Sequence, residues 1–121
     1  MDKRFKIPAI TEFPSYRPFL SAFYRENKAE RSSFSFRYIA SRLQWPTSFF
    51  SDVVYGKREL SMKRALEFSR WVGFDAVKTD YFIKLVLAES KDPVVREYFS
   101  THLPRLPSDN VSAATEASEL A

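Results

Sequence analysis

Apolar residues recur along much of the chain with the 3.6-residue period of an α-helix. In residues 15–28 the apolar positions are 16, 19, 20, 23 and 24, which form one stripe on a helix. Similar spacing, with a cap residue or a proline at most helix starts, predicts further helices over 36–43, 47–55, 62–72, 76–89 and 94–101. No stretch alternates apolar and polar residues as a half-buried strand does. The pattern therefore predicts an all-α fold of five to six helices.

The same periodicity predicts which side chains of two later helices are buried. In the helix over 62–72 these are Met62, Ala65, Leu66 and Val72, and in the helix over 76–89 they are Val77, Tyr81, Phe82, Leu85 and Val86. We expect Trp45 and Trp71 to pack within the protein. For Phe49 two alternatives stay open: a core position, or an exposed apolar contact.

Glycines and prolines mark the ends of these helices. Gly56 and Gly73, the only two glycines, each follow a predicted helix, where a left-handed residue commonly ends it. Beyond Leu103 the composition turns to Pro, Ser, Ala, Thr and Glu, which bury too little apolar area to fold. We expect an N-terminal arm over 1–13, one helical domain over 14–103 and a disordered tail over 104–121.

Composition excludes several classes of function. The 121 residues include no cysteine and a single histidine, which excludes a disulfide scaffold, a thiolate zinc site and a histidine cluster for metal. No Ser/His/acid set can form around His102, which we expect at a helix C-terminus, and two glycines cannot build a phosphate loop. We therefore expect no enzyme, no cofactor and no metal. The chain also lacks a signal peptide pattern and a membrane-spanning apolar run, which favours a cytoplasmic protein.

The charge of the chain is modestly basic. There are 19 Lys and Arg against 15 Asp and Glu, a net charge of +4. Three of the acids, and none of the bases, lie in residues 108–121, so residues 1–107 hold 19 basic and 12 acidic side chains, or +7. This balance mildly favours a polyanionic partner.

Two predicted helices stand close together, over 36–43 and 47–55, separated by a three-residue break and followed by Gly56. This is the pattern of a helix-turn-helix. Residues 35–73 resemble the lambda-repressor-like, xenobiotic-response-element class of these domains, through Ile39-Ala40, the buried pair Phe50 and Val53, and Gly56-Lys57-Arg58. Gln44 stands where that class has its turn glycine. Either the turn avoids a positive φ, or it carries strain of about 1 kcal/mol.

A closer resemblance covers roughly residues 15–100. Its motifs are Tyr16-Arg17-Pro18-Phe19-Leu20, Phe34-Ser35-Phe36-Arg37, Ser48-Phe49-Phe50-Ser51-Asp52-Val53-Val54, Gly56-Lys57-Arg58 with Leu60-Ser61, and Asp80-Tyr81-Phe82 with Leu85-Val86. In this order they are similar to the N-terminal part of a bacterial family of predicted helix-turn-helix regulators. Longer members of that family carry a second, C-terminal helical domain. The chain is expected to be either a short member or a fragment.

The resemblance implies that the N-terminal half of the helix over 47–55 enters the major groove of DNA. The outward residues, interpreted as base readers, are Thr47, Ser48, Ser51, Asp52 and Tyr55. Hydroxyls pair with several base edges, and a carboxylate accepts from cytosine N4. However, this helix has no Arg, Lys, Asn or Gln, and phosphates would repel Asp52. The alternative is a face that is simply solvated or contacts another protein.

Basic residues on either side of this helix are interpreted as phosphate contacts. They are Arg37, Arg42, Lys57, Arg58, Lys63 and Arg64. Such contacts position a protein on DNA without reading its sequence. The alternative is a scattered set of solvated charges, because Glu59 and Glu67 lie among them.

The last two predicted helices carry a second apolar set, namely Phe82, Leu85, Val86, Val95, Tyr98 and Phe99. They form either a dimer interface or an ordinary core that holds the first helix against the fifth. The prediction from the whole sequence is a DNA-binding transcriptional regulator with double-stranded DNA as partner, which forms homodimers and lies on the nucleoid when bound. The alternative is an adaptor that binds a protein partner on a helix-turn-helix scaffold.

Overall fold

The computed structural model describes residues 5–101, and all regular secondary structure in this part of the chain is helical. The all-α prediction is confirmed. The elements are the 3-10 helix η1 (Ile10–Glu12), α1 (Tyr16–Glu30), α2 (Phe36–Leu43), α3 (Phe49–Val54), α4 (Met62–Val72), α5 (Ala76–Leu87) and α6 (Pro93–Thr101). None of these helices has the length and apolar content that a membrane span requires. The predicted tail over 104–121 and His102 lie outside the described residues.

Polar caps fix where four of the helices begin. The side chains of Ser15, Ser35, Ser61 and Asp75 accept hydrogen bonds from backbone N–H groups two or three residues further on, at 3.3, 3.0, 3.1 and 2.8 Å. Each bond satisfies a donor that the first turn of a helix leaves unpaired. Because a cap acts within one turn, these starts agree with the sequence prediction.

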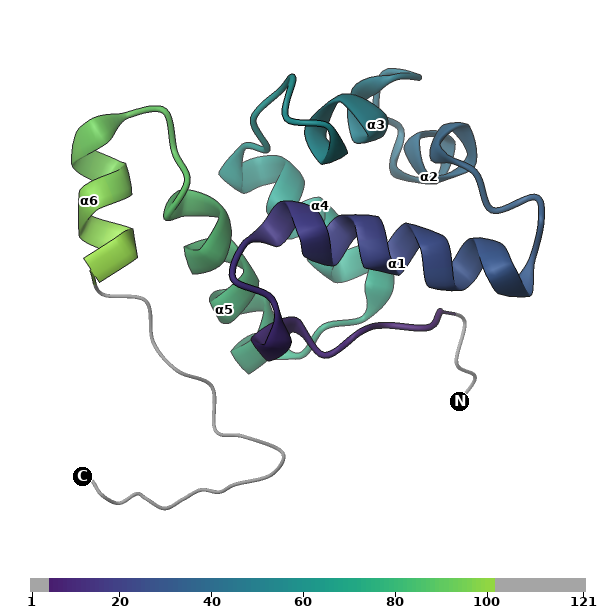
Figure 1. Cartoon of the computed structure of the whole chain (residues 1–121), viewed down its shortest axis with the longest axis horizontal. Coiled ribbons are helices and arrows are strands. Elements are labelled where there is room, and N and C mark those ends of the chain that lie inside the picture. Colours follow the sequence, from purple (N-terminus) through teal and green to yellow (C-terminus); the bar gives the residue numbers. More distant parts are fainter. Residues whose placement is uncertain (1–4, 102–121) are drawn as a thin grey trace, which may run out of the picture.

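The core is built from aromatic rings that α1, α4 and α5 bring together. Phe68 of α4 lies at its centre, with ring centroids 5.3 Å from Phe23, 6.5 Å from Phe19 and 5.4 Å from Phe82. Most of these rings meet edge to face, the geometry that aromatic pairs favour. Figure 1 shows α1 lying across α4, with α2 and α3 above this pair and α5 and α6 at the other end.

The segment 5–13, which sequence separates as an N-terminal arm, packs on this core. The ring of Phe5 lies 4.6 Å from that of Trp71, and Ile10 is buried. Asn27 of α1 is buried as well. Its side chain accepts from the Lys6 N–H and donates to the Lys6 carbonyl, both at 2.8 Å. Residues 1–4 of the predicted arm lie outside the described residues.

Two predictions about burial are wrong, and both concern which side of a helix faces inward. Met62 and Leu66 of α4 are exposed, whereas Phe68, which we did not predict, is fully buried. Val77 at the start of α5 is exposed too. The buried stripe of α4 is centred on Ala65, Phe68 and Val72, because α1 and α5 both pack on that side.

Candidate nucleic-acid interface

A tight turn at Gln44 joins α2 to α3 and sets the angle between them. Gln44 has φ 62° and ψ 39°, the left-handed conformation. Its N–H donates to the Ser41 carbonyl at 3.2 Å, and the Trp45 N–H donates to the Ala40 carbonyl at 2.8 Å. These bonds satisfy the last carbonyls of α2. The sequence left two alternatives for this turn. The structure has the one with a positive φ, which carries strain.

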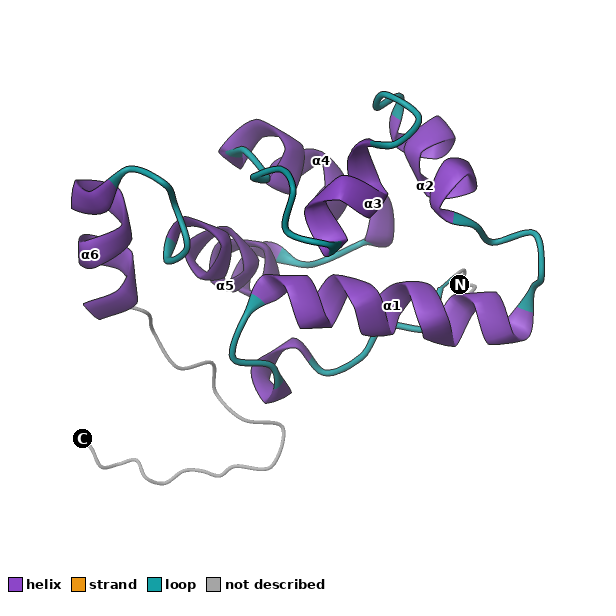
Figure 2. Cartoon of the chain, turned by 45° about the horizontal axis from the view of Figure 1, so that its top comes forward, coloured by secondary structure: helices purple, strands orange, loops and turns teal. Residues whose placement is uncertain are grey.

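Buried aromatic side chains fix the orientation of α3. Phe49 and Phe50 are both buried, so Phe49 belongs to the core and is not an exposed apolar contact. Trp45 packs on Phe49 with centroids 5.3 Å apart, and its Nε1–H donates to Glu67 Oε1 at 2.8 Å. The predicted packing of Trp45 is confirmed. The remaining residues of α3 are half-buried, apart from Val53, which is buried too. Figure 2 shows α3 beside α2 and above α1.

The predicted base readers divide into two groups. Thr47 and Ser48 are exposed but lie in the turn before α3, which begins at Phe49. Tyr55 follows the helix and is 67% exposed. Ser51 and Asp52 are half-buried, and the Ser51 hydroxyl donates to the Ser48 carbonyl at 3.0 Å. The outward face of α3 is thus shorter than the sequence predicts.

Asp52 is held by the loop that follows α3. Its carbonyl accepts from the N–H groups of Lys57 and Arg58, at 2.7 and 3.3 Å. Its carboxylate Oδ2 lies 3.5 Å from Nε of Arg58. The loop therefore folds back along the helix, and a cation offsets the one negative charge of α3.

Of the predicted phosphate contacts, two are held against α3 and four project into solvent. The guanidinium of Arg64 lies 4.4 Å from the centroid of Phe49 and 5.6 Å from that of Trp45, and the guanidinium of Arg58 lies 5.9 Å from Phe49. Such cation–π contacts hold a long side chain in one place. The other four, Arg37, Arg42, Lys57 and Lys63, are exposed, and the Arg58 side chain is exposed as well.

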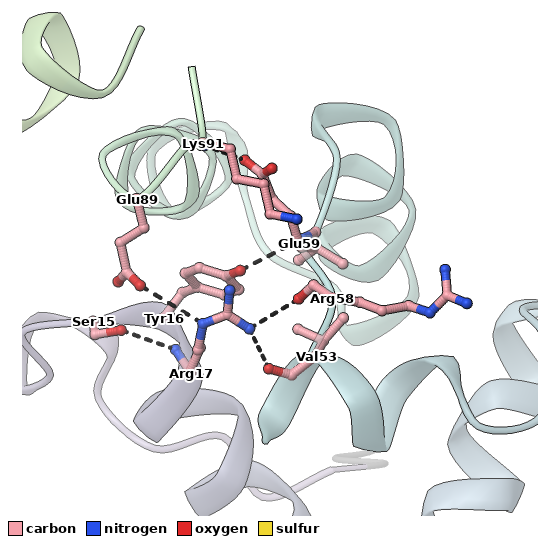
Figure 3. A network of polar contacts seen from close by, with 9 residues as sticks. Ser15, Tyr16, Arg17, Val53, Arg58, Glu59, Glu89 and Lys91 are labelled. Carbon is pink, nitrogen blue, oxygen red and sulfur yellow. Dashed lines mark hydrogen bonds and ion pairs between the residues drawn. The ribbon is translucent and has the colours of Figure 1, made fainter. Parts of the chain in front are cut away.

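Arg17, at the start of α1, holds the loop after α3 through hydrogen bonds to backbone carbonyls (Figure 3). Its Nη1 donates to the carbonyl of Val53, the next to last residue of α3, and to that of Arg58 at 3.0 Å. Its Nε lies 3.8 Å from Glu89 Oε1. We did not predict this role, because the partners lie 36 and 41 residues away and local periodicity holds no sign of them. The only signal was the place of Arg17 in the Tyr16–Leu20 motif.

The neighbouring Tyr16 is buried under the same loop. Its hydroxyl oxygen accepts from the Leu60 N–H at 3.4 Å. Burial raises the pKa of Tyr16 above its ordinary value of 10.0. The positive charge of Arg17 and the hydrogen bond from Leu60 lower this pKa, whereas the negative charges of Glu89 and Glu59 raise it further. Glu59 also accepts from the Lys91 N–H at 3.0 Å. The loop is therefore tied to α1 and to the connection between α5 and α6.

The predicted dimer face does not form one surface. Phe82, Leu85 and Val86 are buried against the core, so they are not accessible to a second molecule. Of the two alternatives, the core is correct for these three. On α6, Tyr98 is exposed while Val95 and Phe99 are half-buried. Phe82, Leu85 and Val86 are buried because α1 and α4 pack on the inner side of α5.

Within residues 5–101, no group of three His, Cys, Asp or Glu side chains is placed to hold a metal ion. No protein-family model matches the chain, and neither the curated proteins nor the solved structures compared with it yield a match.

Proposed function

We propose that the protein is a transcriptional regulator that binds double-stranded DNA through α2 and α3. The start of α3 enters the major groove, as in helix-turn-helix proteins generally. The observation that carries this proposal is the placement of α3. Phe49 and Phe50 anchor one side of it, Thr47 and Ser48 are exposed at its start, and Arg58 and Arg64 lie over the Phe49 ring beside them.

Basic side chains around α3 supply the phosphate contacts in this proposal. They are Arg37, Arg42, Lys57, Arg58, Lys63 and Arg64. If all six contact phosphates, the logarithm of the binding constant falls with the logarithm of salt concentration with a slope of about −5. Such contacts orient α3 in the groove, while base contacts discriminate between sequences.

A homodimer completes the proposal, since paired copies on a two-fold axis read paired half-sites. The proposed dimer interface lies on α6. No residue of this helix is buried, and Val94 is 76% exposed. The same helix favours the second candidate function, an adaptor that binds another protein. The absence of Arg, Lys, Asn and Gln in 47–55 also favours it. In either case we place the protein in the cytoplasm, on the nucleoid if it binds DNA.

The test is a selection of randomised duplexes on the purified protein at about 0.15 M ionic strength, where weak phosphate attraction is screened. We expect recovery of duplexes that share a motif, because α3 presents a defined surface to the groove. Lys57→Glu is expected to weaken binding about tenfold or more and to make the salt slope less steep by about 1.

The matched control is Lys78→Glu. It makes the same change in net charge at an exposed position of α5, outside α2, α3 and their connecting loops. It should bind as the unmodified protein does. Recovery of unselected duplexes alone, or equal losses in the two variants, would contradict DNA recognition through α3 and favour the adaptor.

A further inference from the structure

The loop after α3 brings the guanidinium of Arg58 alongside that helix, next to Asp52 and Phe49. The Arg58 backbone is fixed from two sides, because its N–H donates to the Asp52 carbonyl at 3.3 Å and its carbonyl accepts from Arg17 at 3.0 Å. Figure 3 shows the Arg58 side chain leading away from this network. The position of the Arg58 backbone relative to α3 is thus set by contacts within the protein.

The side chain of Arg58 is held but not covered. Its Nε lies 3.5 Å from Oδ2 of Asp52, and its guanidinium carbon lies 5.9 Å from the Phe49 centroid. The side chain is nevertheless 62% exposed. A guanidinium has five N–H donors in a planar fork, so engagement of Nε leaves the two terminal nitrogens able to donate outward.

These two terminal nitrogens fit a particular acceptor pair. Guanine presents N7 and O6 side by side in the major groove, and a bidentate arginine is the commonest specific contact to them. Residues 47–55 contain no Arg, Lys, Asn or Gln that could make a bidentate base contact. The loop therefore supplies to α3 the donor that the helix itself lacks.

The carboxylate of Asp52 makes Arg58 better suited to contact a base than to contact a phosphate. The Asp52 carboxylate, 3.5 Å from Nε, offsets the positive charge of Arg58 and would repel a phosphate that approaches it, so it weakens the attraction of Arg58 for a phosphate. The edge of guanine carries only partial negative charges on N7 and O6, so the same carboxylate costs less there than beside a phosphate, and it orients the fork. A solvated lysine such as Lys57 meets the needs of a phosphate contact better.

We infer that Arg58 reads a guanine in the major groove and that Asp52 is its positioning residue. This inference rests on the proposed function. It moves Arg58 from the six proposed phosphate contacts to a base, which leaves five, and it moves Asp52 from a predicted base reader to the residue that positions Arg58. The specificity of the protein then includes a G·C pair that depends on the loop after α3.

The experiment is the selection of randomised duplexes repeated with Arg58→Lys, Asp52→Asn and Lys57→Gln. Arg58→Lys keeps the charge but loses the fork, so we expect the preference for one G·C pair to fall by about 5-fold to 150-fold with the salt slope unchanged. Asp52→Asn should reduce the same preference. Lys57→Gln, the matched control, should keep the preference and make the salt slope less steep by about 1.

A second measurement identifies the atom that is read. The recovered duplex is resynthesised with 7-deazaguanine at that pair, which replaces N7 by a carbon and leaves cytosine N4 intact. We expect the unmodified protein to bind this modified duplex about tenfold more weakly than the original one. On the modified duplex, Arg58→Lys should bind no more weakly than the unmodified protein does. Circular dichroism and the thermal midpoint check that each variant is folded.

Three results would overturn the inference. An unchanged G·C preference in Arg58→Lys would mean that Arg58 does not read a base and would leave DNA recognition standing, because lysine keeps the charge that a phosphate contact needs. Full binding of the 7-deazaguanine duplex would show that N7 is not read, and loss of the G·C preference in Asp52→Asn but not in Arg58→Lys would then assign the contact to Asp52 on cytosine N4, again with DNA recognition intact. If the selection enriches no duplex at all, the proposed function and this inference both fall.

Discussion

Gln44 stores local strain at the point where α2 turns toward α3. It is the only residue other than glycine with a positive φ in residues 5–101. In this conformation Cβ crowds the following carbonyl oxygen, at a cost of about 1–2 kcal/mol. The bonds from Gln44 and Trp45 to the last carbonyls of α2 keep the residue there.

Gln44→Gly should therefore stabilise the protein. Removing Cβ relieves the crowding, so we expect the free energy of unfolding to rise by about 1 kcal/mol, measured by urea denaturation. Gln44→Ala is the control, because it shortens the side chain but keeps Cβ. A gain of equal size in the alanine variant would show that the side chain, and not the backbone, is the source of the strain.

At the scale of one element, α4 shows how tertiary packing chooses among apolar positions. Its Met62, Leu66, Phe68 and Val72 are all apolar, and a helix cannot bury every one of them against two neighbours. Phe68 is fully buried and contacts rings of α1 and α5, while Leu66 is 40% exposed. The Phe68 ring therefore faces the core, and the Leu66 side chain lies at the solvent-exposed edge of the core.

Substitutions on α4 should show this difference directly. Phe68→Ala should lower the free energy of unfolding by about 3–5 kcal/mol, since it leaves a cavity among the aromatic rings. Leu66→Ala should cost less than about 1 kcal/mol, because its side chain already meets water. Thermal or urea unfolding of the two variants measures both. Equal losses would mean that α4 is rotated relative to the orientation described above.

At the scale of the whole molecule, the residues at the start of α1 join parts that lie far apart in sequence. Arg17 contacts Val53, Arg58 and Glu89, and Tyr16 lies beneath Leu60. Through these contacts α1 positions the loop after α3 relative to α5. The orientation of the proposed reading surface therefore depends on the complete fold and not on the two motif helices alone.

The buried Tyr16 gives this junction a pH dependence. Its pKa is raised in the folded protein, so folding favours the neutral hydroxyl. The stabilisation is fully present below pH 10, the ordinary value, and is lost as the pH rises through the higher folded pKa. We expect the thermal midpoint of the unmodified protein to fall above about pH 10 more than that of Tyr16→Phe.

Circular dichroism melts between about pH 8 and 11 measure this difference. The control is Tyr55→Phe, which removes an exposed hydroxyl and should follow the unmodified protein. Parallel declines for Tyr16→Phe and the unmodified protein would contradict a role for Tyr16. Lysine titration affects all three proteins alike and cancels in the comparison.

The candidate site was only partly predictable from sequence. The helix-turn-helix pattern placed α2 and α3 correctly to within two residues, and Thr47, Ser48 and Tyr55 are exposed as expected. The contact between Asp52 and Arg58 was not predicted, because it depends on how the loop folds back. That the site binds DNA stays a prediction.

What the sequence by itself determined is the local structure: an all-α fold, the helix starts at Ser15, Ser35, Ser61 and Asp75, and the location of the turn between α2 and α3. Caps and periodicity act over one or two turns, so a short stretch of residues contains the whole cause. Tertiary structure alone decided the rest. It chose Phe68 over Leu66, enclosed Phe82, Leu85 and Val86, and brought Arg17 to the loop after α3. Each of these outcomes depends on which surfaces meet, and residues distant in sequence supply those surfaces.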